Sequence, residues 1–200
     1  MKKIPFLLIY SRILIGFIIG VIAFLEIQHQ AIWIVVLMFL GLLTDVFDGI
    51  IARNLNVATE KLRIWDSNVD QFFWLMVIGS IFYLNFDFIQ ENLLWIGLVV
   101  FLEILCYLVS YLKFRRPIAT HSILAKLWTL TLLAFLIDLA LNGNSFVPFV
   151  ICVVLGIVSR IEIILIILKL KKWTTDVPSV FSVSKLNRGL PIRKNKLFNS

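Results

Sequence analysis

The chain has 200 residues, of which 60% are hydrophobic and only 16% are charged. A soluble domain has about 45–50% apolar and about 25% charged residues, so this composition excludes an ordinary soluble domain. The mean hydropathy of +0.98 indicates a membrane protein instead.

Six apolar segments are long enough to cross a bilayer, which takes about 20 mostly apolar residues in a helix. They cover residues 7–27, 32–53, 66–86, 92–112, 122–141 and 147–169. We therefore expect an all-α integral membrane fold with six transmembrane helices. One domain would cover residues 1–170, and a basic tail would follow over 171–200. The first segment can span, and no small-residue cleavage site follows it, so we expect no cleavable signal peptide.

Basic residues gather on one side of this predicted topology. Of the 19 Lys and Arg residues, 18 lie near the chain start, after the second and fourth segments, or at the chain end. The positive-inside rule places that side and both termini in the cytoplasm, and we expect a bacterial inner membrane. The tail then either lies on the membrane surface, where each basic residue adds ~1 kcal/mol of attraction to anionic lipid, or is disordered. The net charge of +7 follows from this topology and requires no nucleic-acid partner.

Two aspartates near the end of the second segment are unexpected in a membrane helix. Asp45 and Asp48 are spaced i, i+3, and Gly49 and Ala52 continue the same face. Carboxylates at a helix C-terminus oppose the helix dipole, and an Asp at the centre of a membrane helix costs about 2.5–3.5 kcal/mol. A bound cation would explain them.

A second pair of aspartates begins the third segment. Asp66 and Asp70 share a face at i, i+4. Asp66 alone could be explained as a helix cap, but Asp70 lies a turn deeper. Antiparallel neighbouring helices would bring both pairs face to face, and oxygen ligands without His or Cys suit Mg²⁺ or Mn²⁺. Two such ions about 3.5–4 Å apart would stabilise the attacking and leaving oxygens of a phosphoryl displacement.

Small and basic neighbours complete this stretch. Gly49 and Ala52 would give a nucleotide clearance against the helix backbone, or else serve close helix packing. Arg53 could pair with a phosphate oxygen, or it could be an ordinary positive-inside residue.

The spacing of these residues resembles the signature of the CDP-alcohol phosphotransferases, D-xx-D-G-xx-A-R-x8-G-xxx-D-xxx-D. Seven of its eight fixed positions agree, running from Asp45 to Asp70. Leu62 replaces the second Gly, which would narrow the nucleotide pocket or change the course of the connecting loop. Pro5 and Arg12 match a P-N-x-L-T-x-x-R stretch of the family's first helix, and we take that likeness as support for the fold.

The resemblance implies a role for each matching residue. Asp45, Asp48 and Asp66 would bind metal, and Asp70 would complete the site and act as general base. Gly49, Ala52 and Arg53 would contact the CDP group. A hydroxyl would attack the β-phosphorus of a CDP-alcohol, CDP-diacylglycerol by preference, and CMP would leave. The pair Asp66-Ser67 is more similar to the corresponding pair in serine- and inositol-type enzymes than to that in glycerophosphate-type enzymes. The identity of the acceptor alcohol stays open. We also expect a homodimer.

Other polar residues have competing explanations. Arg115 and Arg116 either bind a phosphate on the acceptor or anchor their helix at the membrane surface, and Lys126 could face the same cavity. Glu103, Arg160 and Glu162 lie inside helices, where charges are costly unless paired, so we expect an internal ion pair or a subunit contact. Cys106 and Cys152 are expected to be small core residues.

Two alternatives to the transferase remain at this point. Acidic residues in membrane helices also suit a divalent-metal transporter, although that would need ligands near mid-membrane and exits on both sides. A catalytically weakened homologue of the same fold is the other alternative, favoured by Leu62 alone.

Overall fold

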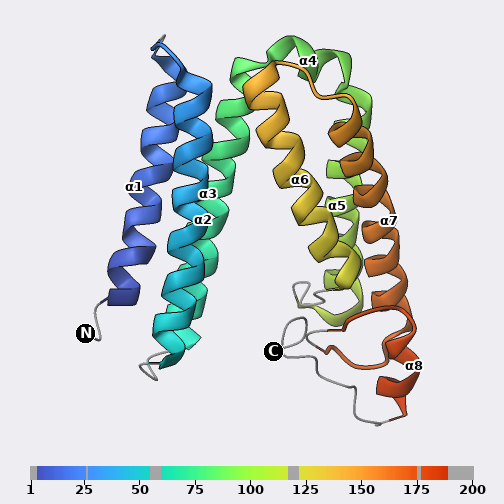
Figure 1. The fold of residues 1–200 in the computed structure, drawn as a ribbon. Coiled ribbons are helices and arrows are strands. Elements are labelled where there is room, and N and C mark those ends of the chain that lie inside the picture. Colours follow the sequence, from blue (N-terminus) through green and yellow to red (C-terminus); the bar gives the residue numbers. More distant parts are fainter. Residues whose placement is uncertain (1–3, 26, 55–59, 117–121, 175–176, 189–200) are drawn as a thin grey trace. The chain divides into compact units, whose positions relative to one another are not determined.

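In a computed structural model, which describes residues 4–25, 27–54, 60–116, 122–174 and 177–188, every regular element is a helix (Figure 1). Six helices are long: α1 (Ile4–Phe24), α2 (Gln30–Asn54), α3 (Glu60–Leu84), α5 (Leu93–Phe114), α6 (Ile123–Asn142) and α7 (Val147–Lys169). Two are short: α4 (Phe86–Glu91) and α8 (Ser182–Asn187). The all-helical fold class predicted from the sequence is confirmed, and each long helix overlaps one of the six predicted segments.

Five of the long helices could cross a membrane by their length and apolar composition within the described residues: α1, α2, α5, α6 and α7. In α3 the apolar stretch found among the described residues, Asn68–Leu84, is shorter. These helices indicate an integral, multi-pass membrane protein. The sixth span and the cytoplasmic placement of both termini stay predictions.

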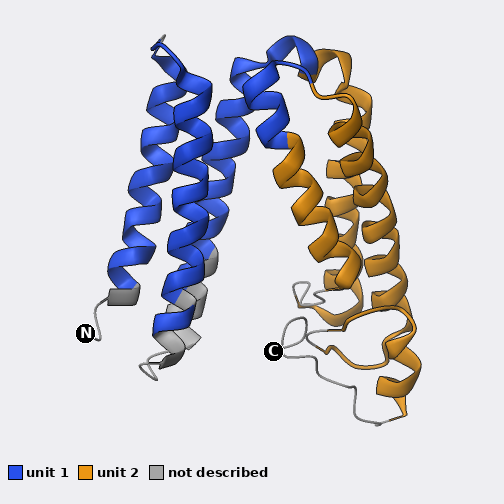
Figure 2. Ribbon diagram, in the orientation of Figure 1, with its two compact units in different colours: residues 1–88, 136–144 blue, residues 89–135, 145–200 orange. Residues whose placement is uncertain are grey.

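The chain divides into two compact units (Figure 2). The first contains Met1–Phe88 and Leu136–Asn144, and the second contains Ile89–Phe135 and Ser145–Ser200. The predicted single domain over residues 1–170 stays a prediction.

In the first unit, α1 packs against both α2 and α3, and glycines of α1 and α2 face α3 (Figure 1). A Cβ atom at Gly16 would lie 3.5 Å from the Cα of Phe73, and one at Gly20 would lie 3.3 Å from the sulfur of Met76. Gly41 of α2 meets the ring of Phe73 from the other side. Small residues let membrane helices approach closely, so these three glycines bring the polar residues of α1, α2 and α3 together.

In the second unit, α5 packs against α7. Cys106 is buried with Ile163 and Ile167, and it is a free thiol, as expected for a small core residue. The guanidinium of Arg160 donates to Glu103 at 2.7 Å and lies 3.5 Å from the ring centroid of Trp128. The expected internal ion pair is therefore present between α5 and α7.

Candidate metal centre

The four aspartates of the motif lie on two helices of the first unit. Asp45 and Asp48 occupy the last three turns of α2, which continues to Asn54. Helix α3 begins at Glu60, so Asp66 and Asp70 lie in its second and third turns. Because Asp66 lies six residues inside its helix, the explanation of Asp66 as a helix cap is wrong, and neither aspartate of this pair caps α3.

Three of these carboxylates converge. Asp45, Asp48 and Asp66 each offer an oxygen, and these oxygens lie within 4.8 Å of one another. The side chain of Asp48 is only 4% exposed, whereas that of Asp45 is 42% exposed. The expectation that α2 and α3 bring their carboxylates face to face is confirmed for these three residues.

Arg12 of α1 lies at the centre of the cluster and contacts all four carboxylates. Its Nη1 lies 2.9 Å from Asp45 and 3.3 Å from Asp66, and it also pairs with Asp70. Its Nη2 pairs with Asp48. The arginine side chain is 1% exposed, and its Nε has no hydrogen-bond partner among the described residues. Three helices thus supply one site. Arg12, the one cation found there among the described residues, is held by carboxylates from α2 and α3.

By sequence alone, Arg12 is one of the basic residues of the chain start, and its motif match supports the fold. That interpretation missed its position in the site. A usable signal was present, since a charged residue more than two turns inside an apolar helix requires a partner. The four aspartates of the motif were acidic residues available to pair with it.

The charge of the cluster favours a further cation. When all groups are ionised, four carboxylates and one guanidinium carry a net charge of −3. Like charges at this separation repel one another, most strongly where water is excluded, as around Asp48. Among the described residues, the possible metal ligands of the cluster are carboxylate oxygens, and none is a His or Cys atom. This is the ligand set that Mg²⁺ or Mn²⁺ prefers. The residues therefore fit the divalent metal that the motif's resemblance implies.

The predicted nucleotide contacts are less fully visible. Gly49, Ala52 and Arg53 lie within α2, and Leu62 lies within α3, but their side chains are outside the described residues. Their roles stay predictions.

The other candidate residues belong to the second unit. Arg115 ends α5 in the left-handed conformation, and the Arg116 guanidinium lies 5.0 Å from the Trp173 ring centroid. Glu162 accepts a hydrogen bond from the backbone N–H of Val180 at 3.4 Å. These contacts are structural, and Glu162 is not a member of the Glu103–Arg160 pair. The acceptor-phosphate role of Arg115 and Arg116 stays a prediction. A cavity-facing role for Lys126 stays a prediction as well.

Comparison with known proteins agrees with the motif. The family model of the CDP-alcohol phosphatidyltransferases matches residues 2–178, which include the four aspartates and Arg12. No curated protein and no solved structure gave a match. Because the family model covers most of the chain and both compact units, the chain belongs to the CDP-alcohol phosphatidyltransferase family.

Proposed function

We propose that this protein transfers the phosphatidyl group of CDP-diacylglycerol to the hydroxyl of an alcohol acceptor and releases CMP. Transfer of a phosphatidyl group from a CDP-alcohol to an alcohol, a step of phospholipid biosynthesis, is the reaction of its family. The observation that carries the proposal is the convergence of the α2 and α3 carboxylates around Arg12. A diacylglycerol donor is supported because Asp45 and Asp48 lie on a helix that can span a bilayer, where the acyl chains of a donor can remain in lipid.

Asp45, Asp48 and Asp66 would hold two Mg²⁺ or Mn²⁺ ions, with Asp70 completing the site. When bound, such ions would stabilise the negative charge that develops on the phosphate oxygens. Arg12 orients the carboxylates, because one guanidinium pairs with all of them, and it keeps part of their charge compensated.

Asp70 is the proposed general base. Its side chain is 34% exposed, so an acceptor hydroxyl can reach it, and its pairing with Arg12 fixes its position. Asp70 takes the hydroxyl proton while the oxygen attacks the β-phosphorus of the donor. The new P–O bond forms as the bond from that phosphorus to CMP breaks, and CMP carries away the electron pair.

The remaining assignments follow the motif. Gly49 and Ala52 would leave clearance for the nucleotide, and Arg53 would pair with a phosphate oxygen of the CDP group. We also propose that the active side faces the cytoplasm of a bacterial inner membrane and that the protein is a homodimer.

The proposed function is tested with the purified full chain in mixed micelles. CDP-diacylglycerol and Mn²⁺ are supplied with serine, inositol, inositol phosphate or glycerol phosphate, CMP release is measured, and the lipid product is identified by mass spectrometry. We expect CMP release with one acceptor and a product whose mass equals phosphatidyl plus that acceptor. CMP release without any new lipid would contradict a transferase. Mn²⁺ flux into vesicles without CMP release would support the transporter instead.

A further inference from the structure

The chain beyond α7 folds back onto the second unit. Val177 and Val183 are buried against Ile166 and Leu170 at the end of α7. The side-chain amide of Asn187 donates to the carbonyl of Lys169 at 2.9 Å, and its oxygen accepts from the backbone N–H of Lys171 at 3.1 Å. This segment, residues 170–174 with 177–188, therefore forms a terminal fold that closes the end of α7.

A pocket of about 510 Å³ opens on this terminal fold. Three cationic side chains line it, together with two polar residues and one aromatic ring: Lys169, Lys171, Arg188, Ser184, Asn187 and Phe181. None of its lining residues is acidic. The five ion pairs found among the described residues involve Arg12 and Arg160, so within that part of the chain no carboxylate pairs with the cations of the pocket.

The cations of the pocket contrast with a nearby lysine whose side chain donates to backbone carbonyls. Lys113 of α5 donates to the carbonyls of Ile167 and Leu168, at 3.1 and 2.6 Å, and so satisfies the C-terminal end of α7. Among the described residues, no such hydrogen bond to a backbone carbonyl is found for the side chains of the pocket cations. Three positive charges that have no carboxylate partner among the described residues, together with Ser and Asn donors, form the kind of site that binds a phosphate group.

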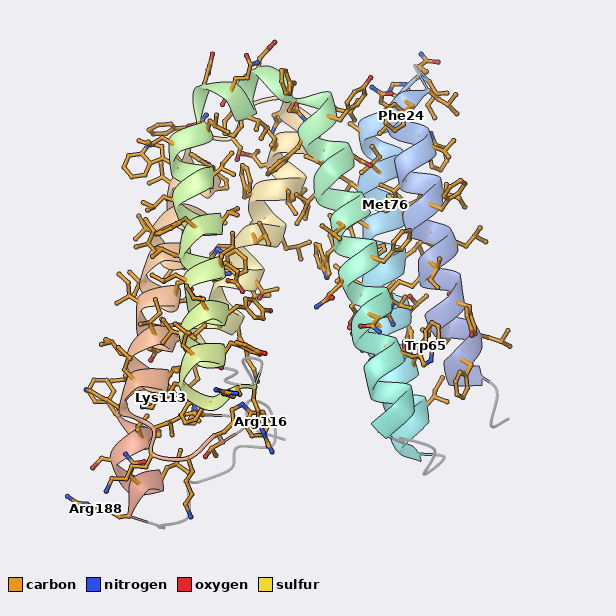
Figure 3. The ribbon with its side chains drawn as sticks, turned by 180° about the vertical axis from the view of Figure 1, so that it is seen from behind. Phe24, Trp65, Met76, Lys113, Arg116 and Arg188 are labelled. Carbon is orange, nitrogen blue, oxygen red and sulfur yellow. The ribbon has the colours of Figure 1, made fainter. Side chains whose placement is uncertain are left out.

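The position of the pocket indicates where that phosphate comes from. Lys169 is the last residue of α7, a helix long and apolar enough to cross the membrane. In Figure 3, Arg188 lies at the same end of the second unit as Lys113 and Arg116. The Phe181 side chain is 86% exposed, and Trp173 lies beside Arg116. Aromatic and basic residues together at the end of a membrane helix are typical of the lipid–water interface.

We propose that this pocket binds the phosphodiester headgroup of an anionic phospholipid, while the ring of Phe181 contacts the acyl region. A free phosphate ion would satisfy the same cations, but it would gain nothing from an exposed aromatic ring. A lipid in the pocket would hold the terminal fold at the membrane surface. The proposal is independent of the proposed transferase activity, because none of its residues belongs to the acidic cluster.

The test uses the purified full chain in micelles of zwitterionic detergent. Thermal unfolding is followed by tryptophan fluorescence while phosphatidylglycerol, phosphatidylcholine or inorganic phosphate is added. The double variant Lys171→Gln/Arg188→Gln removes two pocket cations. The matched control Lys172→Gln/Lys185→Gln removes two cations from the same segment that do not line the pocket.

Phosphatidylglycerol should raise the unfolding midpoint of the wild type, and phosphatidylcholine should not. The half-saturating mole fraction of phosphatidylglycerol should rise about tenfold or more in the pocket variant, and less than about twofold in the control variant. Without added lipid, all three proteins should unfold at similar temperatures. Equal shifts in both variants would show a diffuse charge effect and overturn the pocket. Stabilisation by inorganic phosphate at equal concentration would overturn the lipid as its ligand, and so would an absence of any lipid effect.

Discussion

The guanidinium of Arg12 on α1 pairs with the buried carboxylate of Asp48 on α2, and neither side chain is more than 4% exposed. The same guanidinium reaches Asp70 on α3, so a single residue joins the three helices of the first unit at their polar centre. Removal of one partner from a buried ion pair costs about 3–5 kcal/mol, because a charge is left uncompensated.

Arg12→Gln should therefore lower the stability of the first unit, near the lower end of that range because Asp45, Asp66 and Asp70 reach solvent. The unfolding midpoint in detergent measures the loss. Because a divalent cation can replace part of the missing positive charge, Mn²⁺ should stabilise the variant more than the wild type. Arg12→Lys keeps the charge and loses the fork of two donors, so it should fall between them. An unchanged midpoint in Arg12→Gln would show that the pairing contributes nothing to stability.

Replacement of the proposed base should abolish turnover without unfolding the protein. Asp70→Asn keeps the shape of the side chain but cannot accept the hydroxyl proton, and general-base catalysis contributes about 10²–10⁴-fold in rate. CMP release should fall by about that factor. The control is Asp138→Asn, since Asp138 lies in the same unit but interacts with Asn142 at 2.6 Å, away from the motif. Equal activity in the two variants would remove Asp70 from the mechanism.

The contact between Gly41 and Phe73 sets the approach of α2 to α3 beside the carboxylates. Gly41 lies one turn before Asp45 on α2, and Phe73 lies one turn after Asp70 on α3. The ring of Phe73 is 1% exposed, and a Cβ atom at Gly41 would collide with it, so the ring or the helix would have to shift. Gly41→Ala should cost about 1–3 kcal/mol of stability and lower CMP release.

Gly79→Ala provides the matched control for this prediction. Gly79 lies on α3, and a Cβ atom there would meet no atom within 4 Å. That variant should keep full activity and gain roughly 0.5–1 kcal/mol of helix stability. If both alanine variants behaved alike, close approach at Gly41 would not be what positions the aspartates.

The Glu103–Arg160 pair lies in a separate unit and should affect stability alone. A double-mutant cycle with Glu103→Gln and Arg160→Gln should show a coupling free energy of about 1–3 kcal/mol, because either single variant leaves one charge unpaired in an apolar span. Unfolding in detergent gives the four free energies. Additive effects would mean that the 2.7 Å contact is not energetically coupled.

Much of this protein could be predicted from local sequence patterns. Continuous apolar segments predict the six long helices, since length and hydropathy are sufficient for that purpose. The spacing of Asp45, Asp48, Asp66 and Asp70 predicts a shared site, because helical periodicity places each pair on one face. The start of α3 at Glu60 was missed, as polar helical turns outside the apolar segment carry no hydropathy signal.

Features that depend on tertiary contacts could not be predicted in the same way. The role of Arg12 depends on which face of α1 meets α2 and α3, and the contacts of Gly16 and Gly20 place one face of α1 against α3. The terminal fold was expected only as a basic tail, lying on the membrane or disordered. Its order depends on Val177 and Val183 packing against Ile166, a contact between residues far apart in sequence and invisible to composition.

The central claim is that the carboxylates around Arg12 hold the divalent metal on which phosphatidyl transfer depends. It is tested most directly by CMP release from CDP-diacylglycerol as a function of Mn²⁺ concentration, after chelation, for the wild type and Asp48→Asn. We expect no release after chelation, full recovery with Mn²⁺, and a half-activating Mn²⁺ concentration at least about tenfold higher in the variant. Release that survives chelation, or activation curves that coincide, would contradict it.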